Sequence, residues 1–119
     1  MIAVIFEVFP DPDRRQDYLD IAAKMRPLAE QIDGFISVER FQSLTNSDKL
    51  LSISFFRDEE AVQQWRELTA HRGAQAAGRG GIFTDYHLRI AHVIRDYGMF
   101  ERAEAPEDSR AAHDAKATG

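Results

Sequence analysis

The chain has 119 residues, a length that suits one small domain. Hydrophobic residues make up 44% of it and charged residues 29%, which is an ordinary balance for a soluble protein. The formal net charge of −5 lacks the basic excess that binding to a phosphate backbone requires, so we expect no nucleic-acid partner. Because the chain has no cysteine, disulfides, thiolate metal sites and a cysteine nucleophile are excluded.

The first ten residues read MIAVIFEVFP and do not resemble a signal peptide. They lack a basic start, and Glu7 and Pro10 interrupt the apolar run. No stretch approaches the roughly 20 apolar residues that a membrane-spanning helix needs. We therefore expect a cytoplasmic protein with no membrane partner.

The first third of the chain predicts a strand followed by a helix. Residues 2–9 carry apolar side chains on both parities, which is typical of a strand covered on both faces. The sequence DPD at 11–13 predicts a turn and a helix start, and Asp33-Gly34 predicts the helix end. Pro27 is expected to kink or split this helix. Its apolar stripe consists of Tyr18, Ile21, Ala22, Met25, Leu28 and Ile32.

Two strands and a loop follow. GFISVERFQ (34–42) and KLLSISFF (49–56) predict strands, and the polar stretch SLTNSD (43–48) predicts the hairpin loop between them. Asp58 predicts the cap of a second helix, which must end by GRGG at 78–81. The expected buried face of this helix consists of Val62, Trp65 and either Leu68 or Thr69.

The last part of the chain predicts a long strand at 82–97. The order is then β-α-β-β-α-β, the ferredoxin-like α+β arrangement with a four-stranded antiparallel sheet and two helices on one face. The strands at 2–9 and 82–97 carry apolar side chains toward both faces, so we expect a homodimer that packs sheet against sheet. The predicted domain covers residues 1–98, and the charged residues 99–119 predict a flexible tail.

The chain resembles the antibiotic biosynthesis monooxygenase domain of the dimeric α+β barrel superfamily over about residues 1–98. The resemblance lies in IAVIFEV, GFISVERF, LLSISFFRDEEAVQQWRE, HRGAQAAGR and HVIRDYG. Members of this family include cofactor-free oxygenases of aromatic polyketides, quinol oxygenases, haem-degrading enzymes and proteins with no known reaction. The resemblance implies a pocket between helices and sheet, where a small aromatic substrate reduces O2 without a cofactor.

In the polyketide oxygenases a tryptophan and a polar ring residue six positions later line the pocket, with an arginine on the last strand. The matching residues here are Trp65, His71 and Arg89, and Tyr86 is a further ring near them. The resemblance implies that Trp65 shapes the pocket and that His71 is a base or an oxyanion donor. It implies that Tyr86 and Arg89 orient the substrate. Six residues amount to about 600° of helical rotation, so Trp65 and His71 converge only if the helix breaks between them.

Haem binding or haem degradation is the alternative that the same family offers. Haem-degrading members use an asparagine on the first strand, a tryptophan and a histidine ligand. Trp65 matches the tryptophan, whereas the other two positions fall at Glu7 and Gln75, and glutamine is not a usual iron ligand. Two departures in three weaken the haem alternative. Glu7 and Gln75 remain candidate substrate-binding residues.

The residues also permit simpler interpretations. Trp65 is consistent with a plain core ring, and His71 with a solvated residue near a helix end. Glu7 is consistent with a carboxylate that pairs with an arginine in a pocket or interface, or with a solvated edge residue. His87 and His92 have opposite strand parity, so no metal site is predicted. A dimeric module that binds a small ligand without turnover is the alternative from a different functional class.

Overall fold

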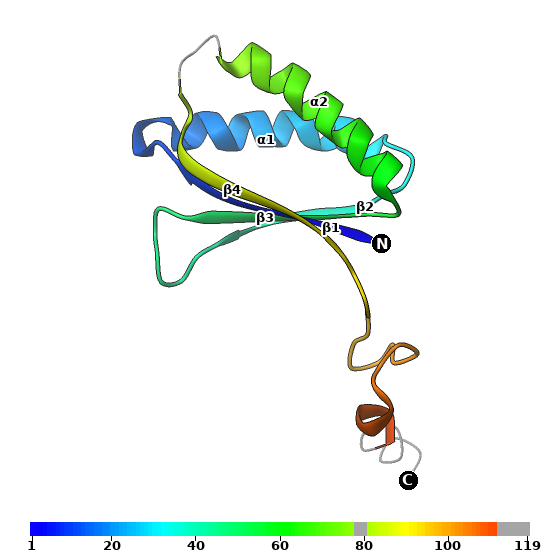
Figure 1. The fold of residues 1–119 in the computed structure, drawn as a ribbon. Coiled ribbons are helices and arrows are strands. Elements are labelled where there is room, and N and C mark those ends of the chain that lie inside the picture. The colour runs from blue at the N-terminus through cyan, green and yellow to red at the C-terminus, as the bar shows by residue number, and fades with distance from the viewer. Residues whose placement is uncertain (78–80, 112–119) are drawn as a thin grey trace.

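The structure is a computed structural model that describes residues 1–77 and 81–111, with the side chains of 70–77 left out of the description. Its elements confirm the predicted order (Figure 1). They are β1 (Ile2–Pro10), the short 3-10 helix η1 (Pro12–Arg14), α1 (Arg15–Glu30), β2 (Phe35–Gln42), β3 (Leu50–Phe56), α2 (Glu59–Ala77) and β4 (Phe83–His92).

The four strands form one antiparallel sheet in the order β2-β3-β1-β4, and both helices lie on the same face of it (Figure 1). This is the predicted ferredoxin-like α+β fold. Directly opposed residues of neighbouring strands project to the same face of a sheet. One row of such partners crosses the sheet as Arg40, Ser52, Phe6 and Leu88, and the next row as Glu39, Ile53, Ile5 and Arg89.

The first helix begins where the DPD turn predicts. The backbone N–H of Asp13 donates a hydrogen bond of 3.0 Å to the carboxylate of Asp11, which caps η1 and leads directly into α1. Pro27 lies inside α1 and does not split it. Proline removes one backbone hydrogen bond, and here the helix continues to Glu30 in spite of that loss.

The second helix is capped by Asp58, as predicted. The carboxylate of Asp58 accepts a hydrogen bond of 2.9 Å from the backbone N–H of Ala61, and this bond and the Arg57 guanidinium hold its pKa below the usual value. Val62 is buried, while Trp65 lies half-buried against the same core. The helix then runs without a break to Ala77. No helix among the described residues is both long and apolar enough to cross a membrane.

The last strand is shorter than the sequence predicts, because it ends at His92 rather than near residue 97. A backbone hydrogen bond of 3.0 Å from Val93 to Met1 marks the end of its pairing with β1. Beyond it the chain leads away from the sheet and the helices (Figure 1). The division into a domain at 1–98 and a flexible tail at 99–119 stays a prediction.

The core lies between the helices and the sheet in two clusters. One contains Ile2, Val4, Phe56, Ala61 and Val62, and the other contains Val8, Tyr18, Leu50 and Ile82. In β3 every second residue is buried, which is the period expected of a strand with helices on one side. The two clusters leave the middle of the helix-covered face free for a cavity.

Gly34 joins α1 to β2 at a φ of +94°, a conformation that residues with a side chain rarely adopt. A Cβ at this position would lie 3.0 Å from the Cβ of Ala61 on α2. The turn therefore depends on glycine both for its backbone angle and for the close approach of α2.

We expect Gly34→Ala to lower the free energy of unfolding by about 1–2 kcal/mol or more, the usual cost of a left-handed conformation for an alanine. Urea unfolding followed by circular dichroism measures this loss. Gly98→Ala is the matched control, since a Cβ there meets no atom within 4 Å. Equal stability of the Gly34→Ala variant and the wild type would contradict the assigned role.

Candidate functional site

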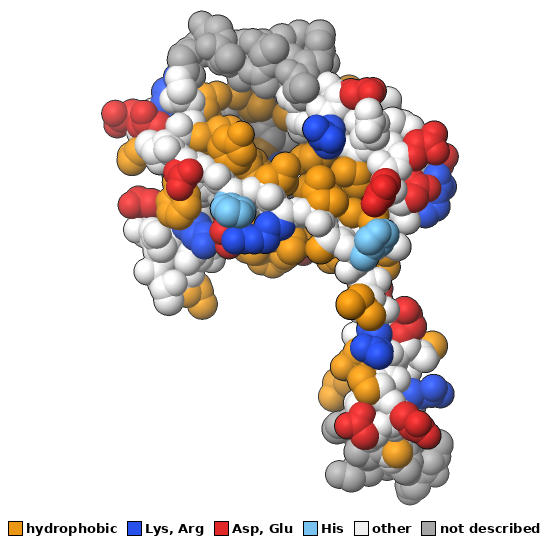
Figure 2. Space-filling model, in the orientation of Figure 1, with side chains coloured by type: hydrophobic (Ala, Val, Ile, Leu, Met, Phe, Trp, Pro, Cys, Tyr) orange, Lys and Arg blue, Asp and Glu red, His pale blue; other side chains and the backbone are white. Residues whose placement is uncertain are grey.

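A cavity of about 1000 Å³ lies between the two helices and the sheet. Figure 2 shows hydrophobic side chains gathered around a hollow between α2 and β4. Helix α1 contributes Tyr18 and Met25 to its wall, and α2 contributes Trp65. Most of the lining surface is apolar, which suits a ligand with an apolar body.

Aromatic rings form both ends of this cavity. Toward β4, the rings of Phe6, Tyr18, Phe83 and Tyr86 contact one another edge to face, with centroids 5.5–6.1 Å apart. Toward α2, the ring of Phe56 lies 6.2 Å from that of Trp65. Edge-to-face contacts of this kind stabilise fixed ring positions. The aromatic walls are therefore set by the fold before any ligand binds.

The floor of the cavity has a polar part. It is made by Arg40 of β2 and by Ser52 and Ser54 of β3. Ser52 and Ser54 are 6% and 4% exposed, and Ser52 is the direct cross-strand partner of Arg40. Three polar side chains of the sheet thus contribute to a cavity whose lining surface is mostly apolar.

The structure separates the residues that the sequence groups into one site. Trp65 and Tyr86 line the cavity. Glu7 and Arg89 project to the opposite, helix-free face, because their neighbours Phe6 and Leu88 occupy the cavity side. The side chains of His71 and Gln75 lie outside the described residues.

Trp65 is both a core ring and a wall of the cavity, the two interpretations that its sequence context permits. Its ring packs against the buried cluster around Phe56 and also lines the cavity. The break in α2 that would bring positions 65 and 71 to one side is absent, since the helix is continuous from Glu59 to Ala77. Along a continuous helix these two positions lie on different faces. The catalytic role of His71 stays a prediction.

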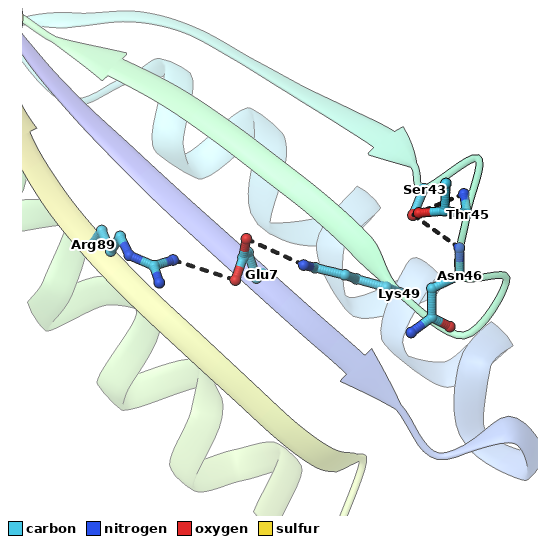
Figure 3. A network of polar contacts seen from close by, with 6 residues as sticks. All are labelled: Glu7, Ser43, Thr45, Asn46, Lys49 and Arg89. Carbon is cyan, nitrogen blue, oxygen red and sulfur yellow. Dashed lines mark hydrogen bonds and ion pairs between the residues drawn. The ribbon is translucent and has the colours of Figure 1, made fainter.

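Glu7 is held by two cations on the helix-free face (Figure 3). Lys49, just before β3, lies 3.2 Å from one carboxylate oxygen, and Arg89 of β4 lies 3.2 Å from the other. The hydrogen bonds from Lys49 and Arg89 hold the pKa of Glu7 below its ordinary value. These ion pairs therefore link Glu7 of β1 to β4 and to the residue that precedes β3.

The same placement argues against haem in this cavity. Glu7 occupies the position of the asparagine that haem-degrading members use, yet it lies on the far face of the sheet and is engaged by Lys49 and Arg89. It does not reach a group held between the helices and the sheet. Among the described residues, no cluster of three or more histidines and carboxylates could hold a metal ion.

The floor and one wall are defined by residues that the sequence does not identify as candidates. Phe6, Phe83, Arg40, Ser52 and Ser54 all line the cavity without having been singled out. The alternation in LLSISFF does indicate a polar site. Ser52 and Ser54 occupy alternate positions that are buried, where an apolar residue is expected. Arg40 is identified only once the register pairs it with Ser52.

Because folding lowers the pKa of Glu7, the carboxylate stabilises the fold above its unfolded-state pKa. This stabilisation is lost as the pH falls through the lowered folded-state pKa. We therefore expect Glu7→Gln to be less stable than the wild type at pH 7, with the difference shrinking in acid. Urea midpoints between pH 3 and pH 7 measure it, with the exposed Glu39→Gln on the same face as control. A difference that does not change with pH would contradict this role.

Comparison of the sequence with known families and proteins is consistent with the fold. The profile of the antibiotic biosynthesis monooxygenase family matches residues 1–77. Jasmonate monooxygenase ABM of Pyricularia oryzae is 42% identical over 121 residues, an alignment that covers 100% of this chain and 56% of the relative. The chain thus spans little more than half of that relative. The Bacillus subtilis protein YqjZ is 32% identical over 79 residues, which cover 66% of this chain and 67% of YqjZ.

Solved structures at low identity share the fold. Rv0793 from Mycobacterium tuberculosis superposes with a TM-score of 0.69 at 19% identity, covering 82% of this chain and 98% of that one. PA3566 from Pseudomonas aeruginosa superposes with a TM-score of 0.65 at 13% identity, covering 78% and 93%. The profile match extends over more than half of the chain and includes β1, both helices, β2 and β3. The chain belongs to the antibiotic biosynthesis monooxygenase family.

Proposed function

We propose that this chain is a cofactor-independent monooxygenase that oxidises a small phenolic or quinol-like molecule with O2 inside the cavity. The observation that carries the proposal is the cavity itself, walled by Trp65 at one end and by Tyr86 with its neighbouring rings at the other. An apolar cavity with aromatic walls suits a flat aromatic substrate. Membership of the family supports the same reaction class.

The reaction balances without an external reductant. A phenol with a free para carbon reacts with O2 to give a quinone and water. The substrate gives up four electrons, one oxygen atom enters the ring and the other leaves as water. The protein has to accept the phenolic proton and stabilise the anion that reduces O2. No group beyond the substrate, O2 and side chains is then needed.

Two residues are proposed to act on the substrate. The hydroxyl of Tyr86, on a ring that lines the cavity, is proposed to hydrogen-bond the substrate oxygen. His71 is the base that the resemblance implies, and Gln75 is a further wall position that it implies. Arg89 is engaged by Glu7 on the other face, so we assign it to the support of β4 rather than to substrate contact.

We expect the metal-free protein to consume one O2 for each quinone formed from a phenol or an anthrone. Tyr86→Phe should lower kcat about tenfold or more, and His71→Ala about 10²-fold if it is the base. An oxygen electrode with EDTA present measures both rates, and heat-denatured protein corrects for spontaneous oxidation. Tyr97→Phe and His92→Ala, outside the cavity lining, are the matched controls.

The outcomes separate the functional classes. Saturable binding of the phenol without oxygen uptake would replace the enzyme with a ligand-binding module. Oxygen uptake that His71→Ala leaves unchanged would remove His71 from the mechanism and keep the monooxygenase.

Jasmonate is a second candidate substrate, because one relative is named a jasmonate monooxygenase. Its chemistry differs from that of a phenol. Inserting one oxygen atom of O2 into a C–H bond and releasing the other as water takes four electrons in all. The C–H bond supplies only two of them. A reductant such as NADPH would have to be added, so the dependence of oxygen uptake on reductant distinguishes the two substrate classes.

We also propose that the working unit is a homodimer joined through the helix-free face of the sheet. Apolar side chains of β1 and β3 occupy this face without a covering layer in the described chain. They are Ile5, Phe9, Leu51, Ile53 and Phe55, all half-buried. A second copy would cover them and would enclose the Glu7 ion pairs.

Light scattering at micromolar concentration should give twice the mass of the chain. Ile53→Asp should give a monomer, because the new carboxylate would be buried without a partner at the interface. Ala23→Asp, on the exposed side of α1, is the control and should stay dimeric. A wild-type monomer would overturn the proposed dimer and leave the cavity and its reaction untouched.

A further inference from the structure

Arg40 is the unexplained cation of the cavity. It extends from β2 into the lining, beside its cross-strand partner Ser52. Its Nε atom is buried and has no hydrogen-bond partner in the described structure. Buried donors are nearly always satisfied, and an exception calls for a specific reason.

No described carboxylate neutralises this guanidinium. Two acids, Glu67 and Asp85, contribute to the cavity lining, but each bonds elsewhere. The Glu67 carboxylate accepts a hydrogen bond from Gln63, and that of Asp85 accepts one from the backbone N–H of Tyr86. By contrast, Arg57 and Arg89 are each paired with acids. A buried N–H donor without an acceptor costs stability, so the free Nε–H of Arg40 points to a partner that arrives from outside.

We propose that Arg40, Ser52 and Ser54 form a binding site for a carboxylate, and that the phenol or other small apolar substrate of this cavity carries that group. The inference rests on the proposed function and adds to it the feature by which the substrate is chosen. The guanidinium supplies paired donors that match a carboxylate, and the two serine hydroxyls supply further donors beside it. The rings of Phe6, Trp65 and their neighbours then contact the apolar body.

The charge count favours a carboxylate over a phosphate. One guanidinium with two neutral hydroxyls balances a single negative charge. A phosphate at neutral pH carries close to two, and the rest of the floor offers no second described cation. Two further arginines that contribute to the lining, Arg26 and Arg66, lie on exposed helix positions rather than on the floor. A monocarboxylate with a ring or a short hydrocarbon chain fits these limits.

Binding is tested without turnover, through the fluorescence of Trp65, the only tryptophan in the chain. The probes are jasmonate and octanoate, each compared with its neutral methyl ester. We expect both acids to bind at least tenfold more tightly than their esters, on the scale of one charge-assisted hydrogen bond. Arg40→Gln should abolish this preference, and the control Arg95→Gln, an exposed arginine outside the cavity, should retain it.

Every outcome bears on the proposal. Esters that bind as tightly as the acids would overturn it on the wild type alone, whether or not the variant folds. A preference that persists in Arg40→Gln would also overturn it. Acid-selective binding with no oxygen uptake, from phenols or from the acids supplied with NADPH, would support the carboxylate site and contradict the monooxygenase. Oxygen uptake with no preference for acids over esters would do the reverse.

Discussion

The two-residue alternation of the antiparallel ladders is the constraint on which the site depends. Each step along β1 or β4 moves a side chain from the helix-covered face to the free one. Phe6 therefore faces the cavity while Glu7 faces away, and Leu88 lines the cavity while Arg89 pairs with Glu7. A shift of one residue in the register would exchange the aromatic wall for an ion pair.

The charged side chains on the two faces of the sheet consequently differ in whether they are paired. On the free face, Glu7 is satisfied by Lys49 and Arg89, and these pairs tie β1 to its neighbours. On the covered face, Arg40 lines the cavity beside its cross-strand partner Ser52, and no ion pair joins it to a carboxylate of the described chain. The first arrangement is self-contained. The second is complementary to an anion, which is why the polar floor and the aromatic walls are best understood as parts of one binding site.

The sequence predicts the fold far better than the site. Strands, caps and helix ends follow local rules, and the order of elements is confirmed from β1 to β4. Pro27 leaves α1 unsplit. The end of β4 was predicted wrongly, because a run of apolar residues does not fix where pairing stops. The site depends on register across three strands, and no local pattern contains that information. Trp65 and Tyr86 were found through the resemblance, whereas Arg40 needed the ladder that places it beside Ser52.

The position of β4 at the edge of the sheet has a consequence for the behaviour of the protein at high concentration. An edge strand presents unpaired backbone groups to which a strand of another molecule can add, and this is a common route to aggregation. On its free face β4 carries His87 and Arg89 in alternate positions. An incoming strand would have to accommodate these charged and polar side chains in close succession. The same strand that walls the cavity on one face is thus protected on the other against uncontrolled sheet growth.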